Sequence, residues 1–265
     1  MVTATEDMRA AMRDYQNNFK RAIREMQPQI GAWSSLCSNL AAEILGESGF
    51  DWVLLDTEHA PNELPIVVTQ LQALKATGAS AVVRPAWNDP VLIKRFLDAG
   101  AQSLLLPFVQ NAAEARAAVA SAFYPPDGIR GLSLGSRANG YGRLASEIKK
   151  VQKEICIIVQ IETAEALDNL EAIASVDGVD GIFIGPADLS ADLGHLGNPG
   201  HPEVWTALED AAKRIRRLGK PPGILVGPKD AKRCLDLGFV FIAGCTDVGL
   251  ITAGSNALLA TMKGS

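Results

Sequence analysis

Few features of this sequence point to disulfides, structural zinc or a membrane. Four cysteines occur in 265 residues, and no two of them form a C-x-x-C pair or a spacing typical of zinc ligands. We expect buried, reduced thiols instead. No apolar stretch approaches the roughly 18 residues that span a bilayer, and the segment 1–27 is too polar for a secretory signal. These absences predict a cytoplasmic protein with no membrane partner.

An excess of positive charge is also missing. The formal net charge is -5 and the pI is about 5.3, whereas a general nucleic-acid binder usually carries a basic excess. One basic cluster, residues 213–220, has helical spacing and acidic neighbours. That pattern favours a solvated helix face, with a subunit interface as the alternative. We therefore expect no nucleic-acid partner.

Short apolar runs alternate with helical patterns along the whole chain. Most runs are continuous, which is typical of parallel strands covered on both faces, and 48% hydrophobic residues suffice for one full core. Eight such units favour a (β/α)8 TIM barrel over an open doubly wound sheet, because no G-x-G-x-x-G follows the first run. The predicted strands are Ile30–Ser34, Trp52–Asp56, Ser80–Arg84, Ser103–Pro107, Ile155–Glu162, Gly181–Gly185, Gly223–Val226 and Phe239–Ala243.

The helical patterns between these runs have recognisable ends. Asp89 and Pro90 form a good N-cap pair, and Gly100 stands where a helix closes. Apolar residues spaced from Met8 to Met26 predict a further, amphipathic helix. We therefore expect an N-terminal helical extension over residues 1–27 and a single barrel domain over residues 28–265. The predicted barrel helices include Leu64–Thr77, Pro90–Ala99, Ala112–Ala122, Ala164–Ala174, Pro202–Leu218 and Ala231–Leu237.

Two carboxylates stand at the ends of apolar strands, where chemistry is found in a TIM barrel. Glu162 and Asp188 follow neighbouring strands, and an uncompensated carboxylate is costly in such a place. Two hard oxygen ligands suit Mg²⁺ or Mn²⁺, and Co²⁺ also fits. The alternative is that each carboxylate caps a helix, Asp188 above all. Their position on adjacent strands favours a divalent-metal site.

Three further polar residues are candidates for catalysis. Arg84 ends the third strand, where its cation can hold a substrate carboxylate or a developing oxyanion. A salt bridge to Asp56 or Glu58 is the alternative, and both roles are compatible. His59 follows the second strand and suits proton transfer near neutral pH; a structural role is the alternative. Asp98, on the helix after the third strand, is a candidate to orient this ring, and a plain surface position is its alternative.

Six long motifs at or near the predicted strand ends carry a family resemblance. They are Gly49–Trp52, Asp56–Pro61, Val83–Pro90, Tyr124–Gly131, Gln160–Thr163 and Gly185–Ser190. With these motifs the chain resembles the HpcH/HpaI aldolase family, the class II pyruvate aldolases, from about Gly31 to its C-terminus. The resemblance implies a reversible aldol reaction between a 2-keto acid, pyruvate or hydroxypyruvate, and an aldehyde.

The resemblance also implies roles for individual residues. The metal is expected to chelate the keto acid and to lower the cost of its enolate. The implied site is Glu162 and Asp188 for the metal, Arg84, Gln160, Ala187 and Asp188 for the substrate, and His59, Arg84 and Asp98 for catalysis. Relatives assemble as hexamers, trimers of dimers in which C-terminal helices are exchanged, and the apolar tail 250–262 is compatible with that.

Some features depart from the family pattern or leave rivals open. Thr57 stands where relatives commonly carry glycine, and residues 132–143 differ from the family, so the aldehyde acceptor stays undefined. A Schiff-base aldolase would need a lysine in an apolar strand-end pocket, and Lys229 is the sole candidate. The other rivals are an acyl-CoA lyase of the citrate-lyase β type, which would need a basic adenine-binding rim, and a non-catalytic barrel that binds a keto acid.

Overall fold

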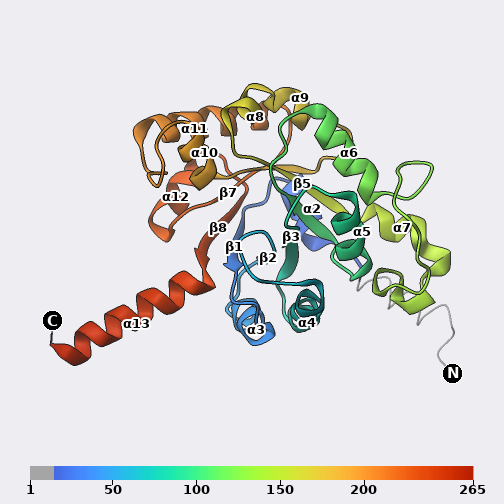
Figure 1. Ribbon diagram of the computed structural model, residues 1–265, viewed down its shortest axis with the longest axis horizontal. Coiled ribbons are helices and arrows are strands. Elements are labelled where there is room, and N and C mark those ends of the chain that lie inside the picture. Colours follow the sequence, from blue (N-terminus) through green and yellow to red (C-terminus); the bar gives the residue numbers. More distant parts are fainter. Residues whose placement is uncertain (1–14, 265) are drawn as a thin grey trace.

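The predicted apolar runs pair side by side in chain order, and the last strand closes on the first. The computed structural model describes residues 15–264, and in it eight parallel strands form a closed barrel surrounded by helices (Figure 1). The TIM-barrel prediction is confirmed. The strands are β1 (Gln29–Ser34), β2 (Trp52–Asp56), β3 (Ser80–Arg84), β4 (Ser103–Leu106), β5 (Cys156–Ile161), β6 (Gly181–Ile184), β7 (Pro222–Leu225) and β8 (Phe241–Thr246).

The eighth strand differs most from its predicted bounds. It begins two residues later than Phe239, whose backbone N–H donates to the carbonyl of Cys234 and so closes the preceding helix. It also extends to Thr246, because its final residues pair with Trp33 across an irregularity in the ladder to β1. The apolar pattern locates this strand but does not locate its ends.

Helices follow the strands as predicted, with one interruption. The predicted helix Ala164–Ala174 is two short helices that meet at Asn169, whose side chain donates to the carbonyl of Gln110 at 3.0 Å. The helices are α2 (Asn18–Arg24), α3 (Asn39–Glu47), α4 (Leu64–Lys75), α5 (Pro90–Asp98), α6 (Ala112–Ala122), α7 (Ile148–Lys153), α8 (Ala164–Asp168), α9 (Leu170–Ala174), α10 (Pro186–Asp192), α11 (Pro202–Arg217), α12 (Pro228–Asp236) and α13 (Asp247–Lys263), with 3-10 turns at Arg137–Gly142 and Ala145–Glu147.

Large aromatic residues fill the inside of the barrel near the N-terminal ends of its strands. Trp52 and Phe241 are fully buried there. The neighbouring strands make room with glycine, since a Cβ on Gly31 would lie 2.3 Å from Trp52 and one on Gly223 would lie 2.0 Å from Phe241. The interior is therefore a packed core, and the open mouth lies at the carboxyl ends of the strands.

Helix α2 belongs to this core. Phe19 and Ile23, on one face of the helix, have no exposed surface, and the Phe19 ring lies 5.5 Å from Trp52, centroid to centroid. The predicted amphipathic helix is present over Asn18–Arg24, where it closes the barrel end opposite the mouth. The remainder of the proposed extension, residues 1–14, lies outside the described residues.

The last helix stands apart from the barrel. Helix α13 begins where β8 ends and projects away from the other elements, as Figure 1 shows. Its apolar side chains at Leu250, Ile251, Leu258 and Leu259 are exposed. Among the described residues, no helix is both long enough and apolar enough to cross a membrane.

Candidate active site

Two neighbouring strands end in an ion pair. The register of β2 and β3 places Asp56 beside Arg84, and the guanidinium donates from Nε to Oδ1 at 2.9 Å and from Nη2 to Oδ2 at 2.7 Å. Trp33 of β1 donates from its indole N–H to the same carboxylate at 3.1 Å. Although burial raises the pKa of Asp56, the hydrogen bonds and charge of Arg84 outweigh it and hold that pKa below its usual range.

Glu58 brings a second carboxylate to the same arginine. Its Oε2 lies 2.9 Å from Arg84 Nη1; this contact lacks hydrogen-bond geometry and is an ion pair only. Burial raises the pKa of Glu58, the Arg84 cation opposes that rise, and the charges of Asp56 and Asp188 add to it. Arg84 therefore contacts two carboxylates, and two of its five N–H groups are not needed for these contacts. Asp56 and Glu58, together with Glu162 and Asp188, whose charges interact with that of Glu58, form what we call the acidic cluster.

Glu162 is a second deeply buried acid at the mouth, with 3% of its surface exposed. Its Oε1 accepts from the backbone N–H of Phe108 at 2.8 Å, and its Oε2 accepts from the side chain of Gln160. Burial raises the pKa of Glu162 to about 7, and the charges of Glu58 and Asp188 act in the same direction against these hydrogen bonds. The side-chain oxygen of Gln160 is buried and has no hydrogen-bond partner among residues 15–264.

The turn between β6 and α10 lies close to Glu162. A Cβ on Gly185 would come within 2.8 Å of Glu162 Oε2 and 2.9 Å of Gln160 Nε2, so a larger residue here would displace the ends of these two side chains. Ala187 and Asp188 follow in the first turn of α10, and both are exposed at the mouth. The short α10 thus presents Asp188 toward the same side as Glu162.

The carboxylate and amide oxygens at the barrel mouth suit a hard divalent cation. Glu58, Glu162 and Asp188 lie close enough for each charge to act on the others, and burial makes the negative charge of Glu162 costly unless a cation lies beside it. The unpartnered amide oxygen of Gln160 adds a neutral acceptor. Carboxylate and amide oxygens are the ligands that Mg²⁺ and Mn²⁺ prefer.

His59 and Asp98 do not meet within the described chain. His59 is 64% exposed at the mouth, and its Nε2 lies 4.0 Å from Glu58 Oε2. Asp98 ends α5, which runs back from the mouth toward the opposite end of the barrel, and there it accepts from Arg130 at 2.6 Å. The expected contact between Asp98 and the His59 ring is thus not made within one copy of the chain, where Glu58 is the acidic side chain beside that ring.

An aromatic pair borders the acidic cluster and was not predicted. Phe108 follows β4 with a φ of 54°, an unusual conformation for a bulky residue, and it directs its N–H at Glu162. Its ring stacks on Trp87, with centroids 5.4 Å apart, and both rings are partly exposed. A backbone donor leaves no signal in the sequence, so residue types alone could not have identified Phe108.

Comparison with known proteins places the chain in one family. A model described as HpcH/HpaI aldolase/citrate lyase matches residues 29–253. A 4-hydroxy-2-oxo-heptane-1,7-dioate aldolase of Klebsiella pneumoniae is 55% identical over 246 residues, 92% of this chain and 93% of the relative. A pyruvate aldolase of Rhizobium etli is 55% identical over 245 residues, 92% of this chain and 96% of the relative.

A solved structure agrees with the sequence matches. An HpcH/HpaI aldolase/citrate lyase family protein from Burkholderia cenocepacia has a TM-score of 0.91 and 36% sequence identity to this chain. The match covers 94% of this chain and 100% of the solved chain. The fold, the residues at the barrel mouth and the extent of these matches agree: the chain belongs to the HpcH/HpaI aldolase/citrate lyase family.

Proposed function

We propose that this protein is a class II aldolase that joins a 2-keto acid to an aldehyde and cleaves the product. The observation that carries the proposal is the grouping at one barrel mouth of Glu162 and Asp188 with Glu58, which contacts Arg84. A divalent cation held by Glu162 and Asp188, with Mg²⁺, Mn²⁺ and Co²⁺ as candidates, would polarise the ketone and make the enolate accessible.

The chain's own residues then divide the remaining tasks. Arg84, fixed by Asp56, directs its free N–H groups at the oxygen where negative charge develops. Gln160 and the backbone of Ala187 hold the keto acid. The exposed imidazole of His59 accepts a proton from the donor methyl group, or from the aldol hydroxyl in cleavage, and Glu58 stabilises the resulting imidazolium at 4.0 Å.

The nature of the substrates follows from the relatives. Proteins named for 4-hydroxy-2-oxo-heptane-1,7-dioate and for pyruvate are equally similar to this chain, which favours pyruvate as donor and an aldehyde as acceptor. Hydroxypyruvate is the alternative donor. The partly exposed Trp87–Phe108 stack beside Glu162 suits the apolar part of an acceptor better than a second charged group.

The rival reactions fit the mouth less well. A Schiff-base mechanism needs a desolvated lysine, and Lys229 stands in the first turn of α12 rather than in the acidic cluster. The citrate-lyase β alternative needs a basic rim for an acyl-CoA, whereas carboxylates dominate this mouth. A non-catalytic barrel would have the same residues, so it must be separated by experiment.

Proton exchange at the donor tests the proposal directly. Metal-stripped protein should not exchange deuterium into the methyl group of pyruvate, and added Mn²⁺ or Mg²⁺ should restore exchange. Borohydride with pyruvate should trap no covalent adduct. Absence of exchange with pyruvate and hydroxypyruvate under every tested metal would overturn the enzymatic function, and an adduct would favour the lysine mechanism.

The protruding helix α13 concerns the oligomeric state of the protein. We propose that this helix packs on another copy of the chain, as in a hexamer with exchanged C-terminal helices. A helix of about 25 Å with several exposed aliphatic side chains is unfavourable in water unless a partner covers it.

A further inference from the structure

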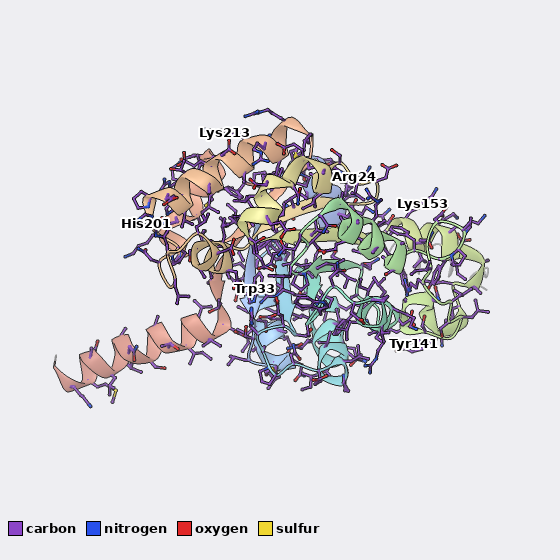
Figure 2. All side chains as sticks on the ribbon, turned by 45° about the horizontal axis from the view of Figure 1, so that its top comes forward. Arg24, Trp33, Tyr141, Lys153, His201 and Lys213 are labelled. Atoms are coloured by element: carbon purple, nitrogen blue, oxygen red, sulfur yellow. The ribbon has the colours of Figure 1, made fainter. Side chains whose placement is uncertain are left out.

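Two of the three histidines in the chain meet away from the acidic cluster. His195 lies in the segment between α10 and α11, and His201 is the N-cap residue of α11. Figure 2 places His201 at the outer edge of the molecule, well separated from Trp33, which contacts the Asp56–Arg84 pair. The metal and substrate roles proposed above use neither histidine.

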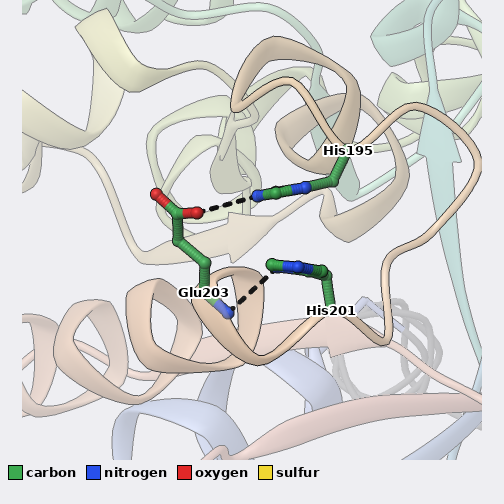
Figure 3. A group of neighbouring side chains, drawn as sticks. All are labelled: His195, His201 and Glu203. Carbon is green, nitrogen blue, oxygen red and sulfur yellow. Dashed lines mark hydrogen bonds and ion pairs between the residues drawn. The ribbon is translucent and has the colours of Figure 1, made fainter.

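Glu203 completes this group, which we call the histidine cluster: His195, His201 and Glu203. The Nε2 of His195 lies 2.8 Å from Oε2 of Glu203, and the two imidazole rings stack with centroids 3.5 Å apart (Figure 3). One ligand atom from each of the three residues lies within 4.8 Å of the other two. The three side chains therefore converge on one point of the surface.

The backbone holds these side chains in place. The N–H of His195 donates to the carbonyl of Ser190 in α10 at 2.7 Å, and the carbonyl of His195 accepts from Asn198. Asn198 in turn accepts from the N–H of His201 at 3.1 Å. Two successive turns thus fix His195 against the first turn of α11, so that binding a ligand there requires only side-chain rotation.

The ligand types specify a class of metal. Two imidazoles and one carboxylate are the donors that Zn²⁺ takes in three-ligand sites, with bonds near 2.0–2.1 Å. Tetrahedral ligands at such bond lengths lie about 3.3 Å apart, so side-chain shifts of roughly 1 Å bring the cluster into range. Imidazole also disfavours Mg²⁺ relative to Zn²⁺, Ni²⁺ or Cu²⁺.

The existing contacts of the cluster are of a kind that a cation can replace. The imidazole–carboxylate contact between His195 and Glu203 leaves the carboxylate open to solvent, since the Glu203 side chain is 64% exposed and that of His195 is 21% exposed. His201 Nδ1 accepts from the Glu203 N–H at a long 3.3 Å. That amide belongs to the first helical turn, where N–H groups lack intrahelical partners and readily bond to water.

We propose that His195, His201 and Glu203 form a second metal site, specific for a borderline transition-metal cation such as Zn²⁺ and separate from the oxygen-ligand site at Glu162 and Asp188. A bound ion would join the segment after α10 to the start of α11. Asp188 lies in the first turn of α10 and His195 follows the end of that helix, so one short helix connects the two sites.

Zinc binding in a background without the barrel-mouth site tests the proposal. Full-length Glu162→Gln protein, stripped with EDTA, is equilibrated with Zn²⁺ by dialysis, and bound zinc is measured for each chain. We expect one zinc per chain. Adding His195→Gln, or His201→Asn, which retains a good N-cap, should weaken this binding by more than the roughly 10–100-fold typical of lost second-shell contacts.

The third histidine supplies the matched control. Glu162→Gln with His59→Gln loses an imidazole outside the cluster and should bind zinc as the Glu162→Gln protein does. His195→Gln alone should retain Mn²⁺ binding at the barrel mouth, since it does not touch that site. Zinc binding that is absent from the Glu162→Gln protein, or that survives both His195→Gln and His201→Asn, would overturn the proposal without bearing on the aldolase function.

Discussion

Arg84 and Asp56, at the ends of adjacent strands, are joined by two parallel hydrogen bonds of 2.9 and 2.7 Å. This geometry fixes the plane of the guanidinium. It uses Nε and Nη2 for the carboxylate, and with Nη1 beside Glu58 it leaves two N–H groups for another oxygen. A lysine could supply the same charge but not the two parallel N–H donors of the guanidinium.

Replacing Arg84 by lysine should therefore separate the effect of the positive charge at this position from the effect of the guanidinium orientation. We expect Arg84→Lys to lower the rate of deuterium exchange into pyruvate by about 10²–10³-fold, the usual cost of losing an oxyanion donor, because the ammonium cannot contact Asp56 and a substrate oxygen in the same way. Circular dichroism should report an intact barrel. Exchange at the wild-type rate would contradict the role given to Arg84.

Gly185 offers a test of the crowding around Glu162. A methyl group at this position would lie 2.8 Å from Glu162 Oε2, so Gly185→Ala should displace that carboxylate and weaken Mn²⁺ binding by about 10-fold or more. Gly227 is the matched control, because it also precedes a proline at the start of a helix and has open space around its Cβ position.

Gly227→Ala should leave metal binding and exchange unchanged. The Mn²⁺ affinity of both variants is measured from the electron paramagnetic resonance signal of the free ion. Equal affinities for Gly185→Ala and Gly227→Ala would mean that Glu162 does not need its observed position to bind the ion.

The Glu162 side chain itself is the sharpest test of the metal site. Glu162→Gln retains the size of the side chain and removes its charge, so divalent-metal affinity should fall by at least about 100-fold, more than a second-shell change costs. The control is Glu165→Gln, an exposed acid three residues further on. Isothermal titration with Mn²⁺ compares the two, and an unaltered titration of Glu162→Gln would exclude this residue as a ligand.

The barrel and the ends of β2 and β3 could be predicted because they depend on local pattern. Continuous apolar runs identify buried parallel strands, and parallel register then places Asp56 beside Arg84. The break at Asn169 and the left-handed Phe108 could not be predicted. Each depends on a contact between segments distant in sequence, Asn169 with Gln110 and Phe108 with Glu162.

The role expected for Asp98 stays a prediction. The resemblance suggested a role beside His59, but a helix that follows a barrel strand runs away from the mouth, so its last residue lies at the far end in the same chain. The convergence of His195 and His201 could not be predicted from the sequence either. It arises from two hydrogen-bonded turns rather than from a regular spacing.

Acid stability should depend on Asp56. Its folded pKa lies below the usual value, so its contribution to the free energy of unfolding is fully present above about pH 4, the ordinary carboxyl pKa, and is lost as the pH falls through the lower, folded pKa. We expect the difference in Tm between wild type and Asp56→Asn to be constant from pH 5 to pH 7 on the order of several degrees and to shrink below about pH 4. A difference independent of pH would show that charge on Asp56 contributes nothing.

The exposed face of α13 should determine the oligomeric state. Ile251, Leu258 and Met262 recur at spacings that place them on one side of the helix, and 58%, 62% and 76% of their surfaces are exposed. Two charges on this side, Ile251→Asp with Leu258→Asp, would be buried in any interface the helix forms. We expect a smaller assembly by light scattering, because an unpaired buried carboxylate costs several kcal/mol.

Ala253→Asp with Asn256→Asp adds at least as much negative charge on the opposite side and should leave the mass unchanged. A single mass for wild type and both variants would mean that this side of α13 contacts no partner, and the exposed aliphatic stripe would need another explanation.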